Sequence, residues 1–277
     1  MGVGGTMGQD QTTSAPEPRS GAPISTVVAV IFDTDGVVTR TASVHAAAWK
    51  EMFDAFLGAS EAVPGESGGE MTDDDYLRYV DGRARFDGVE AFLESRGVTL
   101  AYGEPDDPPE RETICGLGNR KNEAFAAAVR DRGVEPFEST LALARALQAH
   151  GIRTGVVSAS ENCAAILDAA GANDCFETRV DGVDARAQHL AGKPDPALFL
   201  EAAARLGVQP EDAAIVEDAL VGVEAGRRGG FGLVIGVDRN GQASALVEHG
   251  ADIVVPDLAW LEIDGNGRWR TRAPHDH

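Results

Sequence analysis

The stretch VVAVIFDTDG, residues 27–36, joins six apolar residues to two acids and a glycine. The apolar run is shorter than most helices and rich in β-branched side chains, which is typical of a strand covered on both faces. Short runs of the same kind follow at residues 152–157, 213–216, 233–237 and 253–255. The first run therefore predicts a buried strand with Asp33 and Asp35 at its carboxyl end.

Helical patterns lie between these runs, at residues 139–150, 161–170, 196–206 and 219–228. Each is followed by a glycine that can adopt the left-handed conformation of a helix cap: Gly151, Gly171, Gly207 and Gly229. Strands and helices that alternate through short links predict an α/β fold with a doubly wound, Rossmann-like parallel sheet. An active site in such a fold lies at the carboxyl ends of the strands.

One long interval, residues 42–134, lacks such strand runs. It contains helical stretches at 44–57 and 88–96, and acidic loops at 58–70 and 102–110. We therefore expect a helical cap inserted into a core formed by residues 25–41 and 135–264. The terminal segments, 1–24 and 265–277, have little to bury and are expected to be disordered tails.

The composition excludes several classes of partner. A formal net charge of −21 argues against nucleic acid and anionic membranes, because both require a basic face. No apolar run reaches the roughly 18 residues of a membrane span, and the N-terminus lacks the pattern of a signal peptide. Cys115, Cys163 and Cys175 form no C-x-x-C pair, so neither a disulfide framework nor a zinc site is indicated. We expect a cytoplasmic monomer.

Polar residues follow the first two predicted strands. Asp33 and Asp35 can divide the work of a reaction as nucleophile and as proton donor and acceptor, while Gly36 lets the backbone turn closely past both. The pattern D-x-D-G alone is equally typical of a solvated turn. Ser158 follows the next strand, where a hydroxyl beside free N–H groups at a helix N-terminus suits a phosphate. Serine is also a common helix cap.

Two further clusters complete the set. Lys193, one of three lysines in the chain, precedes a proline-led helix and can direct its ammonium group at the same phosphate, although an exposed lysine is the simpler interpretation. Glu217 and Asp218 follow another strand, and adjacent acids beside Asp33 require a cation. Mg2+ suits such oxygen ligands. Four clusters in this order, each at a strand end, are hard to attribute to chance.

The set resembles the four motifs of the haloacid dehalogenase superfamily of phosphotransferases, over roughly residues 27–255. The motifs are DTDGVV at 33–38, Ser158, Lys193 and the pair 217–218. The resemblance implies that Asp33 attacks phosphorus and that Asp35 protonates the leaving oxygen. It also implies that Ser158 and Lys193 bind the transferring phosphoryl oxygens.

The same resemblance implies a Mg2+ site. Its ligands would be Asp33, the main-chain carbonyl of Asp35, and Asp218, with Glu217 as a ligand or close support. Positioning and charge neutralisation do most of the catalysis in phosphoryl transfer, which agrees with this assignment.

The predicted cap resembles that of β-phosphoglucomutases at residues 39–50, 82–85 and 120–122. This closer resemblance implies that His45 assists proton positioning near Asp35 and that Arg85 binds the phosphate that is not transferred. Lys121 and Asn122 would reach the sugar. The substrate-binding residues expected from these segments and the loop after residue 158 are His45, Trp49, Arg85, Lys121, Asn122, Ala159 and Ser160.

Some positions depart from the family pattern. Arg40 stands where these mutases commonly have Asp, and Glu161 where a basic residue is common. The leading hypothesis is a β-phosphoglucomutase that interconverts β-glucose 1-phosphate and glucose 6-phosphate through a bisphosphate. A sugar-phosphate phosphatase of the same superfamily is the alternative. A non-catalytic regulatory protein is the third, against which the intact acids and Lys193 argue.

Overall fold

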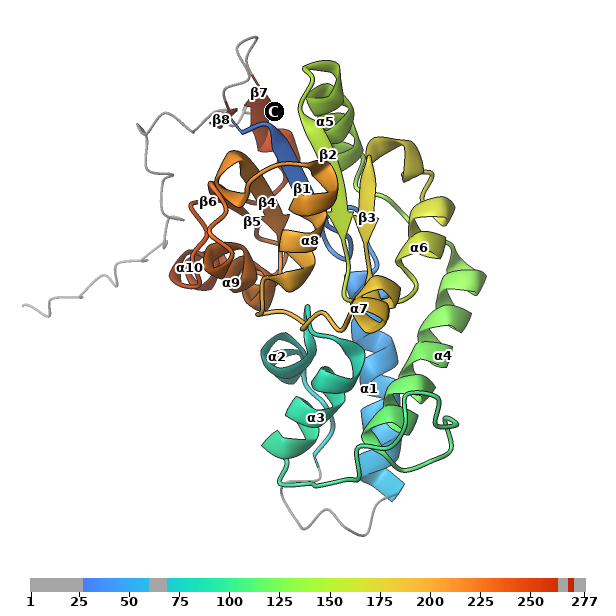
Figure 1. The fold of residues 1–277 in the computed structure, drawn as a ribbon. Helices are drawn as coiled ribbons and strands as arrows, with labels where there is room; N and C mark the ends of the chain where they lie inside the picture. The colour runs from blue at the N-terminus through green and yellow to red at the C-terminus, as the bar shows by residue number, and fades with distance from the viewer. Residues whose placement is uncertain (1–26, 60–68, 264–268, 272–277) are drawn as a thin grey trace, which may run out of the picture.

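The computed structural model describes residues 27–59, 69–263 and 269–271. Its core is a six-stranded parallel sheet in the order β3-β2-β1-β4-β5-β6 (Figure 1). The strands are β1 (Ala29–Asp33), β2 (Arg153–Val157), β3 (Thr178–Val180), β4 (Ala213–Glu217), β5 (Leu233–Val237) and β6 (Ile253–Val255). The chain proceeds outward from β1 to β3 and returns to β4 beside β1, so the order reverses there. This confirms the doubly wound sheet and places the switch point at the ends of β1 and β4.

Helices cover both faces of the sheet, which explains the unbroken apolar runs. Val30 and Phe32 of β1 pack on the side of α5 (Glu138–Ala149) and α6 (Cys163–Ala169). Ala29 and Ile31 pack on the side of α8, α9 and α10. Those helices are α8 (Ala197–Leu206), α9 (Leu220–Arg228) and α10 (Ala243–Glu248). Short 3-10 turns complete the core at Asn173–Cys175, Pro210–Asp212 and Leu258–Trp260.

The expected glycine caps are confirmed at three of four positions. Gly151, Gly171 and Gly207 have φ angles of 74°, 62° and 66°. Gly229 was wrongly assigned, because its φ is −73° and Gly230 takes the positive angle of 72°. The chain simply continues one residue further in a helical conformation before it turns.

The core elements without a counterpart in the sequence prediction include β3 and the helix that follows it. The edge strand β3 has three residues, of which only Val180 is buried, so it forms no apolar run. Helix α7 (Gly182–Gln188) follows it and is capped by Asp181, whose side chain accepts hydrogen bonds from the Val183 and Asp184 N–H groups. Both elements are short, with three residues in β3 and seven in α7, so neither gives a long periodic pattern in the sequence.

The inserted segment is helical, as expected. It contains α1 (Ala42–Ala59), α2 (Asp73–Asp75), the π-helical turn η2 (Tyr76–Val80), α3 (Arg85–Ser95) and α4 (Ile114–Arg132). Within the described part of residues 42–134 no strand is present. A separate apolar core holds these helices together, including Phe53, Phe92 and Leu117. Figure 1 shows them beyond the carboxyl ends of the core strands.

The C-terminal tail prediction is wrong in part. β7 (Leu261–Ile263) pairs antiparallel with β8 (Trp269–Thr271), and Trp269 is buried in the core. The buried Trp269 ring and the pairing with β7 both hold this segment on the core. The predicted tail at 1–24 lies outside the described residues, as do 265–268 and 272–277. In the part that is described, no helix is both long and apolar enough to cross a membrane.

Candidate active site

The loop after β1 directs two acids out of the sheet edge. Asp33 is the last residue of β1, and the N–H groups of Val38 and Thr39 both donate to the carbonyl of Thr34 at 2.9 Å. The Thr34 hydroxyl in turn donates to the carbonyl of Val157, the last residue of β2, at 3.0 Å. The backbone is thereby fixed on both sides of Asp35.

Lys193 lies between two of the predicted acids. Its Nζ donates to Asp33 Oδ1 and, at 2.5 Å, to Glu217 Oε1. Burial by itself would lower the pKa of Lys193, but the two carboxylates outweigh it and raise the pKa. Burial raises the pKa of Asp33 well above its usual range, with Glu217 and Asp35 adding to the effect and Lys193 opposing it. Lys193 therefore holds Asp33 in place. Its single positive charge does not balance the combined negative charge of Asp33, Glu217 and Asp35.

A cation site is present at the same sheet edge. Carboxylate oxygens of Asp33, Glu217 and Asp218 lie within 4.8 Å of one another, and all three residues are buried. Burial raises the pKa of Asp218, and the nearby charges of Asp81 and Glu217 raise it further. Gly36 leaves room for this cluster, since a Cβ there would lie 1.9 Å from Asp218 Oδ2. The residues fit Mg2+, a hard cation bound by a few carboxylates.

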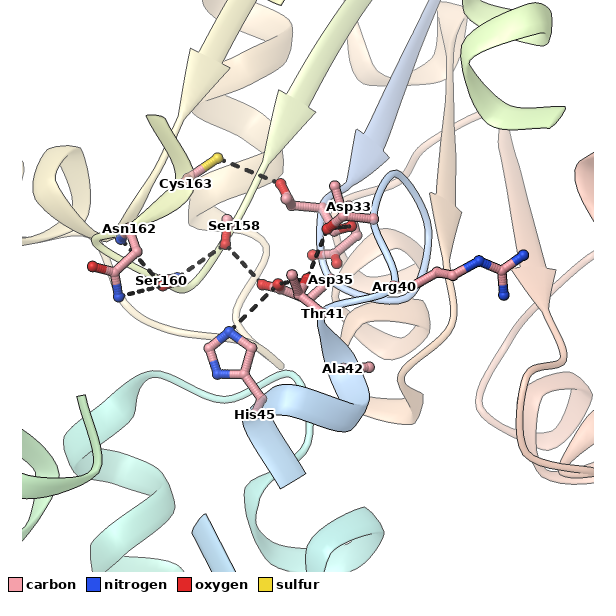
Figure 2. Close-up of polar contacts among 12 residues, drawn as sticks. Asp33, Asp35, Arg40, Thr41, Ala42, His45, Ser158, Ser160, Asn162 and Cys163 are labelled. Atoms are coloured by element: carbon pink, nitrogen blue, oxygen red, sulfur yellow. Dashed lines mark hydrogen bonds and ion pairs between the residues drawn. The ribbon is translucent and has the colours of Figure 1, made fainter. Parts of the chain in front are cut away.

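Asp35 has a different environment (Figure 2). Thr41 Oγ1 donates to its Oδ1, Ser158 Oγ donates to its Oδ2 at 3.3 Å, and His45 Nε2 lies 3.4 Å from Oδ1. Burial would raise the pKa of Asp35, but His45, Thr41 and Lys121 together lower it to about 2. The pKa values of Asp33 and Asp35 are thus shifted in opposite directions, as is typical of two carboxyl groups with different roles in one site. Arg40 points away from this group in Figure 2.

His45 connects Asp35 to the cap. Its Nδ1 lies 2.5 Å from Lys121 Nζ, and its ring stacks on Phe125 with centroids 3.8 Å apart. Lys121 Nζ also lies 4.8 Å from the centre of the Trp49 ring. Burial lowers the pKa of Lys121 to about 7 and also lowers the pKa of His45. A protonated Lys121 that donates to Nδ1 requires neutral His45 with its Nε2–H facing Asp35.

The cap and core enclose a cavity of about 700 Å³. Asp33, Asp35 and Asp218 line its core side. All seven expected substrate-binding residues line it as well: His45, Trp49, Arg85, Lys121, Asn122, Ala159 and Ser160. Ser158, Lys193 and Glu217 are almost completely buried and lie behind the lining residues.

The loop at Ser158 differs from the sequence prediction. Helix α6 begins at Cys163, so Ser158 does not open it. The Ser160 N–H donates to Ser158 Oγ at 3.0 Å, and the Asn162 N–H donates to Ser160 Oγ at 3.2 Å. Two N–H groups of this loop, which was expected to offer free N–H groups to a phosphate, are therefore paired with hydroxyls of the loop itself. The interpretation of this loop as a helix N-terminus was wrong.

Several residues of the cavity were not found from the sequence. Tyr76 and Asp81 of the cap lie over the acids, and burial raises the pKa of Asp81 to about 6. The cap is close to the core here, since a Cβ on Gly82 would lie 2.8 Å from Ala219 Cβ. Asp81 directly precedes the segment 82–85, which resembles a cap segment of β-phosphoglucomutases. This position in the sequence could have identified Asp81 as a residue of the site. Arg186 lines the cavity from α7, an element that the sequence did not reveal.

Comparisons with known proteins identify the family of this chain. A family model described as haloacid dehalogenase-like hydrolase matches residues 27–230. The β-phosphoglucomutase of Mycobacterium bovis is 47% identical over 253 residues, which cover 89% of this chain and 96% of that protein. The Bacillus subtilis β-phosphoglucomutase is 30% identical and covers 85% and 92% of the two chains.

A solved structure shows the shared fold. The crystal structure of β-phosphoglucomutase from Clostridium difficile matches with a TM-score of 0.67 at 23% identity, over 85% of this chain and 93% of that one. The chain therefore belongs to the haloacid dehalogenase-like hydrolases, in their β-phosphoglucomutase-like branch, and is an enzyme with phosphomutase or phosphatase activity.

Proposed function

We propose that this enzyme is a Mg2+-dependent phosphomutase that interconverts β-glucose 1-phosphate and glucose 6-phosphate through a phosphoaspartate on Asp33. The observation that supports this most directly is that the reactive acids of the core and Arg85 of the cap line one cavity. A sugar bisphosphate requires two phosphate sites, because one phosphate must be held while the other reacts. Lys121 and Asn122 line the same cavity and are proposed to bind the sugar between them.

The two acids suit the steps of this reaction. Asp35 is ionised at rest, so in the phosphorylated enzyme it can take the proton of a sugar hydroxyl as that oxygen attacks phosphorus. The bond from phosphorus to the Asp33 oxygen breaks as the bond to the sugar oxygen forms. After the bisphosphate exchanges ends, Asp33 attacks the other phosphate and Asp35 returns the proton to the leaving oxygen.

The surrounding residues are proposed to hold this reaction centre. Asp33, the main-chain carbonyl of Asp35, and Asp218 would bind Mg2+, which when bound neutralises charge on the phosphoryl group and the acids. Glu217 suits a supporting role, because it accepts hydrogen bonds from Lys193 Nζ and from the Ala219 N–H at 2.8 Å. Ser158 and Lys193 are each one hydrogen bond from a reacting acid, as ligands of the phosphoryl oxygens would be.

A sugar-phosphate phosphatase is the second candidate, with water in place of the sugar hydroxyl. It is favoured by the ion pair between Glu161 Oε2 and Arg85 Nη2 at 3.2 Å, which offsets the positive charge that Arg85 brings to the cavity. The test is to incubate the enzyme with Mg2+ and β-glucose 1-phosphate, with and without glucose 1,6-bisphosphate. Glucose 6-phosphate that appears faster with the bisphosphate supports the mutase. Free phosphate in equal amount to the consumed substrate indicates the phosphatase, and no turnover would contradict glucose 1-phosphate as the substrate of either activity.

A further inference from the structure

Glu161 lies between two arginines in the cavity. Its Oε2 accepts a hydrogen bond from Arg85 Nη2 at 3.2 Å, and its Oε1 accepts one from Arg186 Nη2. Arg85 begins α3 of the cap, whereas Glu161 and Arg186 belong to the core. All three residues line the cavity that contains Asp33. One carboxylate therefore joins two guanidinium groups that come from opposite sides of the site.

The backbone around Glu161 is closely packed on α7. The Gly182 N–H donates to the Ser160 carbonyl at 3.2 Å, and a Cβ on Gly182 would lie 2.8 Å from the backbone nitrogen of Glu161. Arg186 is four residues after Gly182, which is about one helical turn. The start of α7 thus fixes the loop that carries Glu161, and the next turn of α7 carries its partner.

The side chain of Arg85 is also closely packed, but one of its N–H groups has no hydrogen-bond partner among the described residues. A Cβ on Gly118 would lie 3.1 Å from Arg85 Cγ, so α4 closely borders the stem of the side chain. The guanidinium carbon lies 4.8 Å from the centre of the Phe86 ring. Its Nε is buried and has no hydrogen-bond partner among the described residues. This N–H group is therefore free to donate to an acceptor that enters the cavity.

The charges also indicate an external anion. Burial lowers the pKa of Arg85, and the positive charge of Arg186 lowers it further while Glu161 opposes both. Two guanidinium groups carry two positive charges, and Glu161 supplies only one negative charge between them. A phosphate dianion would balance both arginines and could accept from Nε as well as Nη2 of Arg85.

We propose that Arg186 is a second anchor for the phosphate that is not transferred, and that Glu161 occupies this anion site until the substrate phosphate displaces it. The inference rests on the proposed function, because it requires a substrate with a distal phosphate. Displacement breaks a weak pair with Arg186, whose side chain is 54% exposed, and a more buried pair with Arg85, whose side chain is 15% exposed. The entering phosphate replaces the second contact by accepting from Arg85 itself. The site therefore selects substrates by whether they bring an anion of their own.

The alternative role, called the latch below, is purely structural: Arg85, Glu161 and Arg186 only hold the cap on the core. The two roles predict opposite effects. Under the latch, Glu161→Gln and Arg186→Gln both break the same contact and change KM in the same direction. Under the proposal, Glu161→Gln removes a competitor and lowers KM for glucose 1,6-bisphosphate about 2- to 5-fold. Arg186→Gln removes an anchor and raises that KM about 10-fold, with partial recovery in Arg186→Lys.

The experiment measures KM and kcat for glucose 1,6-bisphosphate and for acetyl phosphate, which has no distal phosphate. The matched control is Arg228→Gln, because Arg228 is 55% exposed, pairs with Glu224 and lies outside the cavity lining. Opposite shifts in KM for the bisphosphate, larger than those for acetyl phosphate, support the proposal. If Glu161→Gln and Arg186→Gln shift the KM for the bisphosphate equally in one direction, or do not shift it, the proposal is overturned. A different result would be that the wild type turns over acetyl phosphate with no preference for the bisphosphate. That result overturns both this inference and the proposed mutase activity, and it leaves the phosphatase alternative standing.

Discussion

Gly36 faces Asp218 so closely that a Cβ atom on Gly36 would lie 1.9 Å from Asp218 Oδ2. Gly36 also has a φ of 90°, which side chains other than glycine rarely adopt. The turn that follows the two acids of the first motif and the acid that follows β4 therefore both depend on the absence of a side chain at Gly36.

Gly36→Ala should displace Asp218 and disable the cation site. A shift of about 1 Å in a catalytic group can cost about 10²-fold in rate, so we expect at least that loss in Mg2+-dependent turnover of acetyl phosphate. Gly97→Ala is the matched control, because Gly97 has a φ of 71° but nothing within 4 Å of the added Cβ. Both variants should lose about 1–2 kcal/mol of stability from backbone strain. Equal activity in the two variants would contradict the crowding argument.

Asp35→Asn should separate phosphorylation from proton transfer. Acetate leaves without a proton, so a first phosphorylation of Asp33 by acetyl phosphate should survive in this variant. Transfer to a sugar hydroxyl should fall about 10²–10⁴-fold, because the amide cannot accept a proton. Rapid-quench kinetics with both substrates measure the two steps. An equal loss in both steps would show that Asp35 has a different role.

The cation site should make Mg2+ stabilisation depend on pH. The pKa values of Asp33 and Asp218 are raised in the folded protein, so the folded state holds more protons than the unfolded state above the usual carboxylate pKa. The chelated protein should therefore lose stability as pH rises through this window. Mg2+ binds the ionised acids, so the gain in Tm on adding Mg2+ should grow from about pH 5 to about pH 8. Asp218→Asn should reduce this gain, and a gain independent of pH would argue against these ligands.

Lys121 should give stability the opposite dependence on pH. Its pKa of about 7 lies below the usual value, so between about pH 7 and about pH 10 the unfolded chain holds a proton that the folded chain lacks. The free energy of unfolding then rises with pH, by at most about 1.4 kcal/mol per pH unit. Lys121→Met should remove this slope in denaturant titrations. Lys50→Met should keep it, because hydrogen bonds to Asp54 and Glu70 raise the pKa of Lys50.

Much of the core site was predictable because its residues occupy strand ends. Asp33, Glu217 and Asp218 come at or directly after the ends of β1 and β4, and parallel strands bring their carboxyl ends to one edge. Apolar runs are visible in the sequence when both faces of a strand are covered. The position of these acids therefore follows from local patterns alone.

The remaining features depend on contacts between distant segments. The pairing of Glu161 with Arg85 and Arg186 requires the cap to lie on the core, and no local pattern specifies that contact. The loop at Ser158 was assigned to a helix because serine is a common cap, yet its hydroxyl is used by the loop and by Asp35. Trp269 was placed in a tail because its neighbours are polar, although burial of its own ring anchors β8.

The central claim is that Asp33 carries the phosphoryl group, and its most direct test is to locate that group. The enzyme is mixed with acetyl phosphate and Mg2+, quenched in acid within one turnover, and digested for mass spectrometry of the peptide that contains residue 33. We expect one phosphoryl group on Asp33 in the wild type, and neither a phosphopeptide nor turnover in Asp33→Asn, although that variant folds. A phosphoryl group on another residue, or wild-type turnover by Asp33→Asn, would contradict the account.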